Sequence, residues 1–157
     1  MLEFDIPGHE KYTIEHVVLD LNGTIARDGE ILPGVGGALA SLGDSVHVVL
    51  LTADTHGTAA GFGDALGIEV RVIASGGWEA GEKLAVVQEL GPDHVFAVGN
   101  GANDALMLSS CAIGVGVIGP EGAARACIES ADIVVTTIAD ALGLLLHPAR
   151  LIATLRT

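Results

Sequence analysis

The chain has 157 residues, with 20 acidic against seven basic side chains and a formal net charge of −13. This length suits one domain with a sizeable core, so we expect a single domain over residues 1–157. The few basic residues do not cluster, and we expect no nucleic acid partner, because binding to a phosphate backbone needs a basic surface. The apolar residues fall in runs far too short to cross a bilayer, so we expect no membrane partner either.

The amino terminus and the cysteines bear on where the protein works. Residues 1–5 contain no basic segment followed by an apolar stretch, so they do not resemble a secretory signal. Cys111 and Cys127 lack the Cys-x-x-Cys spacing and form no disulfide-rich framework, so we expect both to be reduced. These features together predict a soluble, cytoplasmic protein.

Short apolar runs alternate with helical segments along the whole chain. We expect strands at residues 16–19, 46–51, 70–73, 95–98, 112–117 and 133–135. We expect helices at residues 38–42, 58–66, 79–90, 103–110, 121–130 and from 138 onward. The strands are continuous apolar runs, as in parallel sheets that helices cover on both faces. The sequence therefore predicts an α/β fold with a doubly wound, mostly parallel sheet.

Polar residues follow the carboxyl ends of several expected strands. Asp20 follows the first, Thr52 the second and residues 100–104 the fourth, while Lys83 lies near the start of the helix after the third. In such sheets, ligands bind beyond the carboxyl ends of the strands, where the strand order switches. Taken singly, an Asp at this position could cap a turn and a Lys could be solvated, but their joint placement favours a functional site. The acidic chain would repel an anionic ligand, so a phosphate site here needs a cation and backbone N–H groups.

Four short motifs resemble those of the haloacid dehalogenase superfamily. They are residues 17–24 (VVLDLNGT), residues 50–52 (LLT), Lys83 and residues 98–104 (VGNGAND). The last motif has a form shared by the phosphorylation domains of P-type ATPases and by phosphoserine phosphatases. The chain resembles most the soluble, stand-alone P-type ATPase-like phosphatases over nearly its whole length, including residues 51–55 and 118–124.

The resemblance implies phosphatase chemistry with a covalent intermediate. A carboxylate in the place of Asp20 attacks phosphorus in this superfamily and gives an aspartyl phosphate. Thr52 and Lys83 would then contact the equatorial phosphoryl oxygens, where charge lies during transfer. The remaining residues that the resemblance places at the phosphate are Gly23, Ala53 and Asn103.

The resemblance also implies a Mg²⁺ site beside the nucleophile. Mg²⁺ takes hard oxygen ligands and keeps several waters. One Asp20 oxygen, the main-chain carbonyl of Asn22 and a side chain from Asn100 or Asp104 would hold the ion. Which of the last two binds it directly is left open by the sequence.

Two amides occupy positions where many members of the superfamily carry carboxylates. At Asn22, phosphatases usually place an Asp that acts as general acid and base, a contribution typically worth ~10²–10⁴ in rate. P-type ATPases also lack that acid, and leaving groups that need no protonation, such as those of acyl phosphates and anhydrides, would suffer less. At Asn100 a metal-binding Asp is common, so we expect a lower affinity for Mg²⁺.

The intervals between the motifs are too short for a sizeable cap domain, so we expect an open site for a small phosphorylated substrate. Uncapped relatives act on large substrates or use a neighbouring subunit as a lid, which allows for a homo-oligomer. The favoured interpretation is a Mg²⁺-dependent phosphohydrolase that resembles the phosphorylation domain of P-type ATPases. Two alternatives remain, a catalytically weakened phosphate- or nucleotide-binding module and an uncapped sugar-acid phosphate phosphatase. The last ranks lower because its usual fourth motif differs from residues 99–104.

Overall fold

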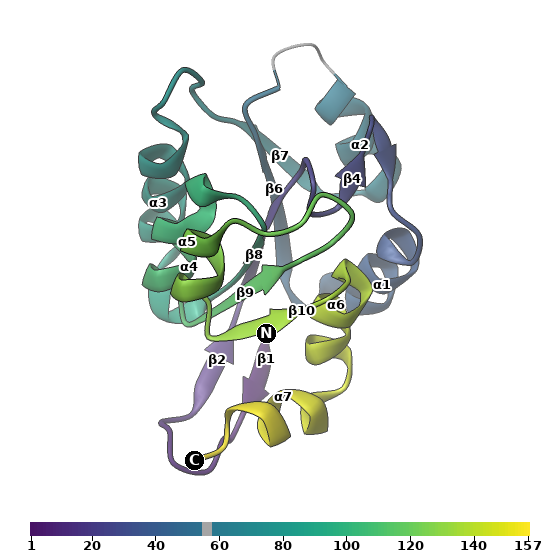
Figure 1. Cartoon of the computed structure of the whole chain (residues 1–157). Coiled ribbons are helices and arrows are strands. Elements are labelled where there is room, and N and C mark those ends of the chain that lie inside the picture. The colour runs from purple at the N-terminus through teal and green to yellow at the C-terminus, as the bar shows by residue number, and fades with distance from the viewer. Residues whose placement is uncertain (55–57) are drawn as a thin grey trace.

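A six-stranded parallel sheet forms the centre of the molecule (Figure 1). The computed structural model describes residues 1–54 and 58–157. The strand order is β10-β9-β8-β3-β6-β7, and neighbouring strands are parallel throughout. The strands are β3 (His16–Asp20), β6 (His47–Thr52), β7 (Glu69–Val72), β8 (Val95–Gly99), β9 (Ile113–Val117) and β10 (Ile133–Val135). The predicted doubly wound α/β fold is confirmed.

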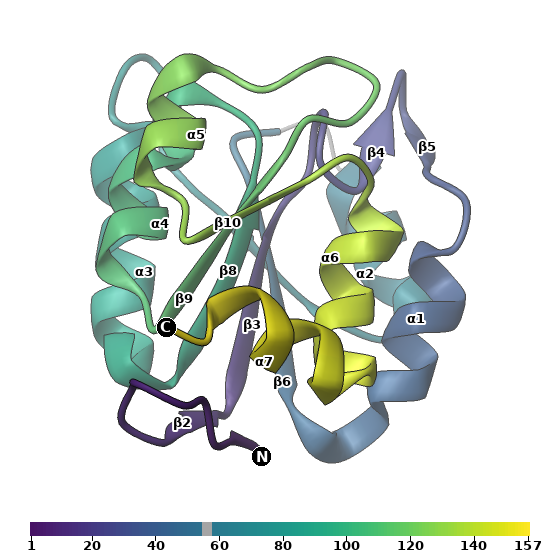
Figure 2. The same ribbon diagram turned by 60° about the horizontal axis from the view of Figure 1, so that its bottom comes forward.

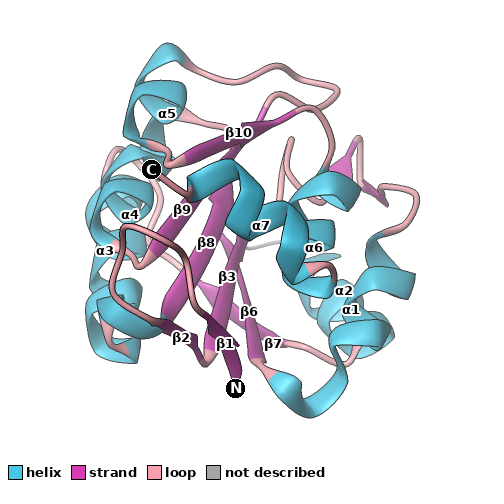
Figure 3. Cartoon of the chain, turned by 90° about the horizontal axis from the view of Figure 1, so that it is seen from below, coloured by secondary structure: helices cyan, strands magenta, loops and turns pink. Residues whose placement is uncertain are grey.

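Helices cover both faces of this sheet (Figures 2 and 3). One face carries α3 (Glu79–Leu90), α4 (Ala105–Ser110) and α5 (Arg125–Ser130). The other carries α1 (Val35–Leu42), α2 (Thr58–Leu66), α6 (Ile138–Leu146) and α7 (Pro148–Leu155). The side chains of β3 alternate between the two cores, since Val17 and Leu19 join the α1 side and Val18 joins the α3 side. Burial on both faces is the reason that the strand is a continuous apolar run.

Two small hairpins were not predicted from the sequence. Strands β1 (Leu2–Phe4) and β2 (Tyr12–Ile14) pair at the amino ends of the sheet strands, and β4 (Ala26–Arg27) pairs with β5 (Glu30–Ile31) after the first motif. The second hairpin turns at Asp28 and Gly29, which both have positive φ (52° and 80°), as in the Asp-Gly turn that joins tight hairpins. The residues that the structure describes form no sizeable cap domain, as expected.

Several predicted helix boundaries were wrong. Helix α1 begins at Val35, three residues before the predicted start. The helix predicted over 121–130 begins only at Arg125, because residues 118–124 form a loop in which Gly119 and Gly122 take positive φ (56° and 78°). A short 3-10 turn, Ala102–Asp104, precedes α4. Thr55, at the end of one of the family-like stretches, lies outside the described residues.

The carboxyl-terminal segment consists of two helices where the sequence predicted one. Pro148 has no N–H to continue α6, and α7 starts there in a new direction. Over residues 1–54 and 58–157, no single helix is long and apolar enough to cross a membrane; α6 and α7 pass that test only as a pair bent by 101°.

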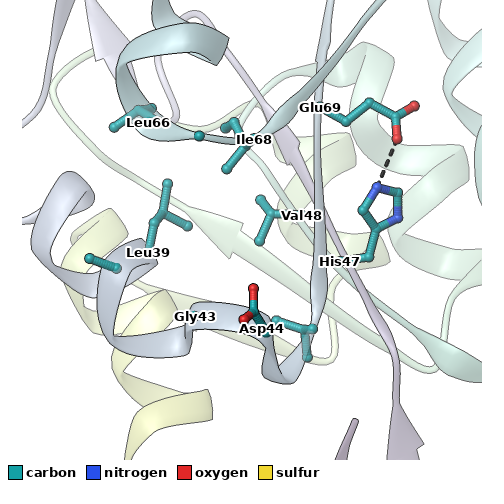
Figure 4. Close-up of a pocket in the computed structure, with 11 residues that line it drawn as sticks. Leu39, Gly43, Asp44, His47, Val48, Leu66, Ile68 and Glu69 are labelled. Atoms are coloured by element: carbon teal, nitrogen blue, oxygen red, sulfur yellow. Dashed lines mark ion pairs between the residues drawn. The ribbon is translucent and has the colours of Figure 1, made fainter.

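A cavity of about 420 Å³ lies near the amino end of β6, between α1, α2 and the sheet (Figure 4). Leu39, Val48, Leu66 and Ile68 line its apolar part. His47 and Glu69 also line it, and His47 Nε2 lies 2.7 Å from Glu69 Oε2. The residues of the four motifs do not line this cavity, so their chemistry belongs to the opposite edge of the sheet.

Candidate active site

The four predicted motifs meet at the carboxyl edge of the sheet. Strands β3 and β8 are neighbours there, although the chain leaves β3 toward β6 and leaves β8 toward β9. This is the switch in strand order at which open α/β sheets bind their ligands. Asp20 is the last residue of β3, and Asn100 follows β8 directly. The sheet topology therefore places the first and fourth motifs side by side.

Lys83 lies between two carboxylates and is almost completely buried. Its Nζ donates to Asp20 Oδ1 and to Asp104 Oδ1, both at 2.6 Å, and Asn103 Oδ1 lies 3.4 Å away. A buried ammonium without partners would cost several kcal/mol, so these contacts account for its position. Burial alone lowers the pKa of Lys83, but the carboxylates of Asp20 and Asp104 outweigh it and raise that pKa above its ordinary value. Lys83 is therefore a fixed positive charge beside Asp20.

Asp104 organises the loop after β8 and is fully buried. Its Oδ1 accepts from Lys83, and its Oδ2 accepts from the backbone N–H groups of Asn100 and Gly101 at 3.0 and 2.8 Å. A Cβ on Gly99 would lie 2.4 Å from the Asp104 carboxyl carbon, so glycine is required there. Both Asp104 oxygens are thus already engaged, and it is the Asn100 side chain that lines the pocket.

The turn after β3 fixes Asp20 through Thr24. The Thr24 hydroxyl is buried, 3.0 Å from Asp20 Oδ2 and 3.2 Å from Asn100 Oδ1. The Leu21 carbonyl accepts from three successive N–H groups, those of residues 24 to 26, which tightens the turn. Gly23 has φ 80°, and its N–H donates to the Ala26 carbonyl at 2.8 Å. Gly23 was predicted to bind phosphate, but in the structure its N–H group is engaged within the turn.

Burial raises the pKa of Asp20 to about 6. The nearby carboxylate of Asp104 acts in the same direction, while Lys83 and Thr24 oppose the rise. The ionised carboxylate of Asp20 is poorly hydrated, which raises its free energy. Reaction with an electrophile such as phosphorus removes that unfavourable charge. Asp20 is thus ionised above pH 6 and aimed at the pocket from the end of a rigid strand.

A pocket of about 260 Å³ brings most of the predicted residues together. Thr52 lies at its wall with an exposed fraction of 2%, and its Oγ1 accepts from the Asp54 N–H at 3.0 Å. The threonine proton therefore stays available to a ligand. The lining residues are Asp20, Asn22, Thr52, Ala53, Ile73, Glu79, Lys83, Asn100, Gly101, Asn103 and Glu121. Gly23 and Asp104 are the two predicted site residues that lie behind the wall.

Two acidic residues that the sequence motifs did not single out also line the pocket. Glu79 accepts from the backbone N–H groups of Gly76 and Gly77 at 3.0 and 2.9 Å, so it holds the loop before α3. Glu121 lies on the loop after β9, and its Oε2 is 2.6 Å from the point that a Cβ on Gly23 would occupy. In the sequence, Glu121 is marked only by its place in the family-like stretch 118–124. The position of that stretch over the pocket depends on the tertiary fold and cannot be read from the sequence.

The donor atoms at the pocket suit a hard cation such as Mg²⁺. Asp20 Oδ2 and Asn100 Oδ1 both lie within 3.2 Å of the Thr24 hydroxyl, so these two oxygens face the same space. Asn22 lines the pocket beside them. In the part of the chain that the structure describes, no three His, Cys, Asp or Glu side chains gather as a metal centre. The residues fit a cation held by oxygens with little negative charge of their own.

Comparisons with known proteins show which sequences the chain resembles. The sequence model of the haloacid dehalogenase-like hydrolases matches residues 1–111. An uncharacterized protein of Methanocaldococcus jannaschii is 47% identical over 78 residues, which cover 47% of this chain and 84% of the relative. A second uncharacterized protein of the same organism is 49% identical over 39 residues, or 25% of this chain and 89% of the relative.

Solved structures share the fold over most of their length. A Streptomyces avermitilis protein assigned to the HAD family hydrolases superposes with a TM-score of 0.67 and 25% identity, over 87% of each chain. The 3-deoxy-D-manno-octulosonate 8-phosphate phosphatase of Moraxella catarrhalis was solved with magnesium, phosphate and the sugar acid. It superposes with a TM-score of 0.68 and 18% identity, over 91% of this chain and 94% of that one. The cobalt-bound phosphatase of the same sugar-acid phosphate from Haemophilus influenzae superposes with a TM-score of 0.69 and 14% identity, over 88% of this chain and 90% of that one.

Proposed function

The chain belongs to the haloacid dehalogenase-like hydrolases, and from this premise we propose that it is a divalent-metal-dependent phosphatase whose nucleophile is Asp20. The observation that carries the proposal is the contact between Lys83 and two carboxylates, Asp20 and Asp104, beside a pocket that Thr52 also lines. A nucleophile, a fixed cation and a threonine hydroxyl that can still donate its proton converge there. Phosphoryl transfer needs this set, because its transition state gathers charge on the equatorial oxygens.

In the proposed reaction, an Asp20 oxygen forms a bond to phosphorus while the bond from phosphorus to the leaving oxygen breaks. The leaving oxygen takes its proton from water, because the N–H protons of the Asn22 amide are not acidic enough to be transferred. A second water then attacks the phosphoryl group on Asp20, which releases phosphate and restores the carboxylate. Lys83 and Thr52 would contact the phosphoryl oxygens in both steps. A bound divalent cation would supply additional positive charge, held by oxygens of Asp20, Asn22 and Asn100.

Two substrate classes follow from different observations. The structural comparisons include sugar-acid phosphate phosphatases of nearly the same chain length, which supports that class over the P-type ATPase-like assignment that the motifs favoured. Asn22, which lines the pocket without an acidic proton, instead favours acyl phosphates and anhydrides, whose leaving groups need none. We propose sugar-acid phosphates as the first class to test and acyl phosphates as the second.

A panel of substrates with Mg²⁺ tests the proposal. The panel contains 3-deoxy-D-manno-octulosonate 8-phosphate, a neutral sugar phosphate, acetyl phosphate and ATP, with release of phosphate as the measurement. We expect turnover that EDTA removes and Mg²⁺ restores. Absence of phosphate release from every member, with Mg²⁺ bound and the protein folded, would reject the enzyme and leave the phosphate-binding module.

Replacing Asn22 with Asp should raise hydrolysis of sugar phosphate esters by about 10²-fold, because it supplies the missing general acid. Asn22 is exposed at the pocket, so the substitution should not disturb folding. Acetyl phosphate serves as the internal control, since its leaving group needs no proton and its turnover should change little. Equal acceleration of both substrates would contradict the role of position 22 as an acid.

The pH dependence of kcat/KM should follow the ionisation of Asp20. Burial raises the pKa of this group to about 6, and only the carboxylate can attack phosphorus. The value of kcat/KM should therefore fall tenfold per pH unit below about 6. The measurement uses subsaturating Mg²⁺, because a bound cation lowers the pKa of its ligand, and circular dichroism at each pH controls for unfolding. A flat profile between pH 5 and 7 would argue against Asp20 as the reacting group.

A further inference from the structure

The side chain of Asn100 contacts two parts of the site at once. Its Oδ1 faces the Thr24 hydroxyl at 3.2 Å, and its Nδ2 donates to the Gly122 carbonyl at 3.1 Å. Its main-chain carbonyl also accepts from the Ala124 N–H at 2.8 Å. Residue 100 thus holds the loop 118–124 by two hydrogen bonds. An Asp at this position would lose the Nδ2 donor and place a negative oxygen against the Gly122 carbonyl.

The loop 118–124 is fixed over the turn that follows β3. The N–H groups of Ile118 and Gly119 donate to the carbonyls of Val135 and Thr136 at 3.0 and 3.1 Å. A Cβ on Gly119 would lie 3.0 Å from the Gly23 carbonyl oxygen, so the loop touches that turn. The views in Figures 1 and 2 show this loop passing from β9 across the carboxyl edge of the sheet before it enters α5. The loop therefore has a defined place at the pocket.

Glu121 carries a carboxylate from this loop to the part of the pocket that Asn100 lines. Glu121 Oε2 and Asn100 Nδ2 lie 2.6 and 2.5 Å from the same point above Gly23, so these two atoms are no more than about 5 Å apart. Glu121 lines the pocket together with Asp20 and Asn22. Within residues 1–54 and 58–157, its carboxylate makes no hydrogen bond or ion pair. Glu121 is exposed, so water solvates its carboxylate, and its negative charge would attract a cation that enters the pocket.

We propose that Glu121 supplies to the divalent cation the negative charge that Asn22 and Asn100 do not. The proposal rests on the proposed function, since it concerns the cation of that site. The charge is relocated from the strand-end motif to a neighbouring loop. The amide of Asn100 is a tether to the middle of that loop at Gly122, while main-chain hydrogen bonds hold its two ends. Asn100 is then a positioning residue for Glu121, in addition to offering its own oxygen.

The test measures binding of Mn²⁺ alone, by electron paramagnetic resonance and by calorimetry, without any substrate. A charge removed about 5 Å from a divalent ion in a solvated pocket weakens binding by about tenfold. We therefore expect Glu121→Gln to raise the Kd for Mn²⁺ about tenfold and Glu121→Asp to raise it less. The charge-matched control is Glu10→Gln, an exposed residue on the β1–β2 hairpin at the opposite edge of the sheet, which should change Kd less than twofold.

A double-mutant cycle with Asn100→Asp tests the tether. Asn100→Asp adds a carboxylate and removes the side-chain hydrogen bond to the Gly122 carbonyl, next to Glu121. Glu121→Gln should therefore cost less than twofold in that background. A tenfold cost in both backgrounds would overturn the role of Asn100 as the tether.

An unchanged Kd for Glu121→Gln, in a protein whose Mn²⁺ binding is lost in Asp20→Asn, would overturn the proposal while leaving the proposed function intact. Weakened Mn²⁺ binding in a protein without phosphate release would instead reject only the proposed function, and absence of Mn²⁺ binding in the unmodified protein would reject both.

Discussion

Replacing Asp20 with Asn should abolish phosphate release while leaving the fold at least as stable as before. The amide cannot form the covalent intermediate, and loss of a nucleophile typically costs more than ~10⁴-fold in kcat. The fold should not suffer, because burial raises the pKa of Asp20 to about 6 from 3.8, which means that the ionised group opposes folding at neutral pH. The amide oxygen can still accept from Lys83. Hydrolysis assays and thermal unfolding at pH 7.5 check the two halves of this expectation.

The sign of the stability change can be examined by varying pH. Between about pH 6 and pH 4, Asp20 takes up a proton in the folded protein before it does so in the unfolded chain. The unmodified protein therefore gains stability relative to Asp20→Asn as the pH falls through this window. The difference in Tm between the two proteins should shrink accordingly. A Tm for the variant well below that of the unmodified protein at pH 7.5 would show that the carboxylate stabilises the fold.

Replacing Lys83 with Met should damage both activity and stability. The substitution leaves Asp20 and Asp104 as two buried carboxylates without their shared cation. Breaking a buried ion pair by removing one partner costs about 3–5 kcal/mol, which for a chain of this size lowers Tm by about 10 °C. Turnover should fall by at least ~10²-fold, because the transferred phosphoryl group loses its fixed positive charge. Thermal unfolding and steady-state kinetics of the purified variant measure both effects.

The control for Lys83→Met is the double variant that also carries Asp20→Asn. Removing one of the two orphaned charges should recover part of the lost Tm, although activity stays absent. Recovery is also expected for the single variant as the pH is lowered toward 5, since protonation removes the repulsion between Asp20 and Asp104. A Tm that responds to neither change would show that Lys83 contributes to stability through packing and not through charge.

The fold was predictable because both faces of the sheet are buried. Val17, Val18 and Leu19 contact cores on alternate sides, so the apolar run in the sequence identifies a central strand. The same property places Asp20 at a strand end, where a charged residue interrupts the run. The hairpin β4–β5 escaped prediction because its strands have only two residues each, too few for a periodic pattern. Its Asp28-Gly29 turn was the one local signal available.

The site was predictable only where a residue follows a strand or belongs to a motif. Asp20, Thr52 and Lys83 converge as the alternation of strands and helices requires. Asp104 lies behind the pocket wall, whereas the Asn100 side chain forms part of that wall. This difference depends on Gly99, whose missing Cβ makes room for the carboxyl group of Asp104. Glu121 reaches the pocket across a contact with Gly23, 98 positions earlier in the chain. No local pattern in the sequence encodes such a contact.

The hydroxyl of Thr24 has a single proton and two acceptors within reach, Asp20 Oδ2 at 3.0 Å and Asn100 Oδ1 at 3.2 Å. It can satisfy only one of them at a time. Whichever oxygen is left without that proton is free to accept from another donor or to bind a cation. Thr24 therefore acts as a selector between the nucleophile and its neighbouring amide, and a valine there, which has the same shape and no proton, would release both oxygens together.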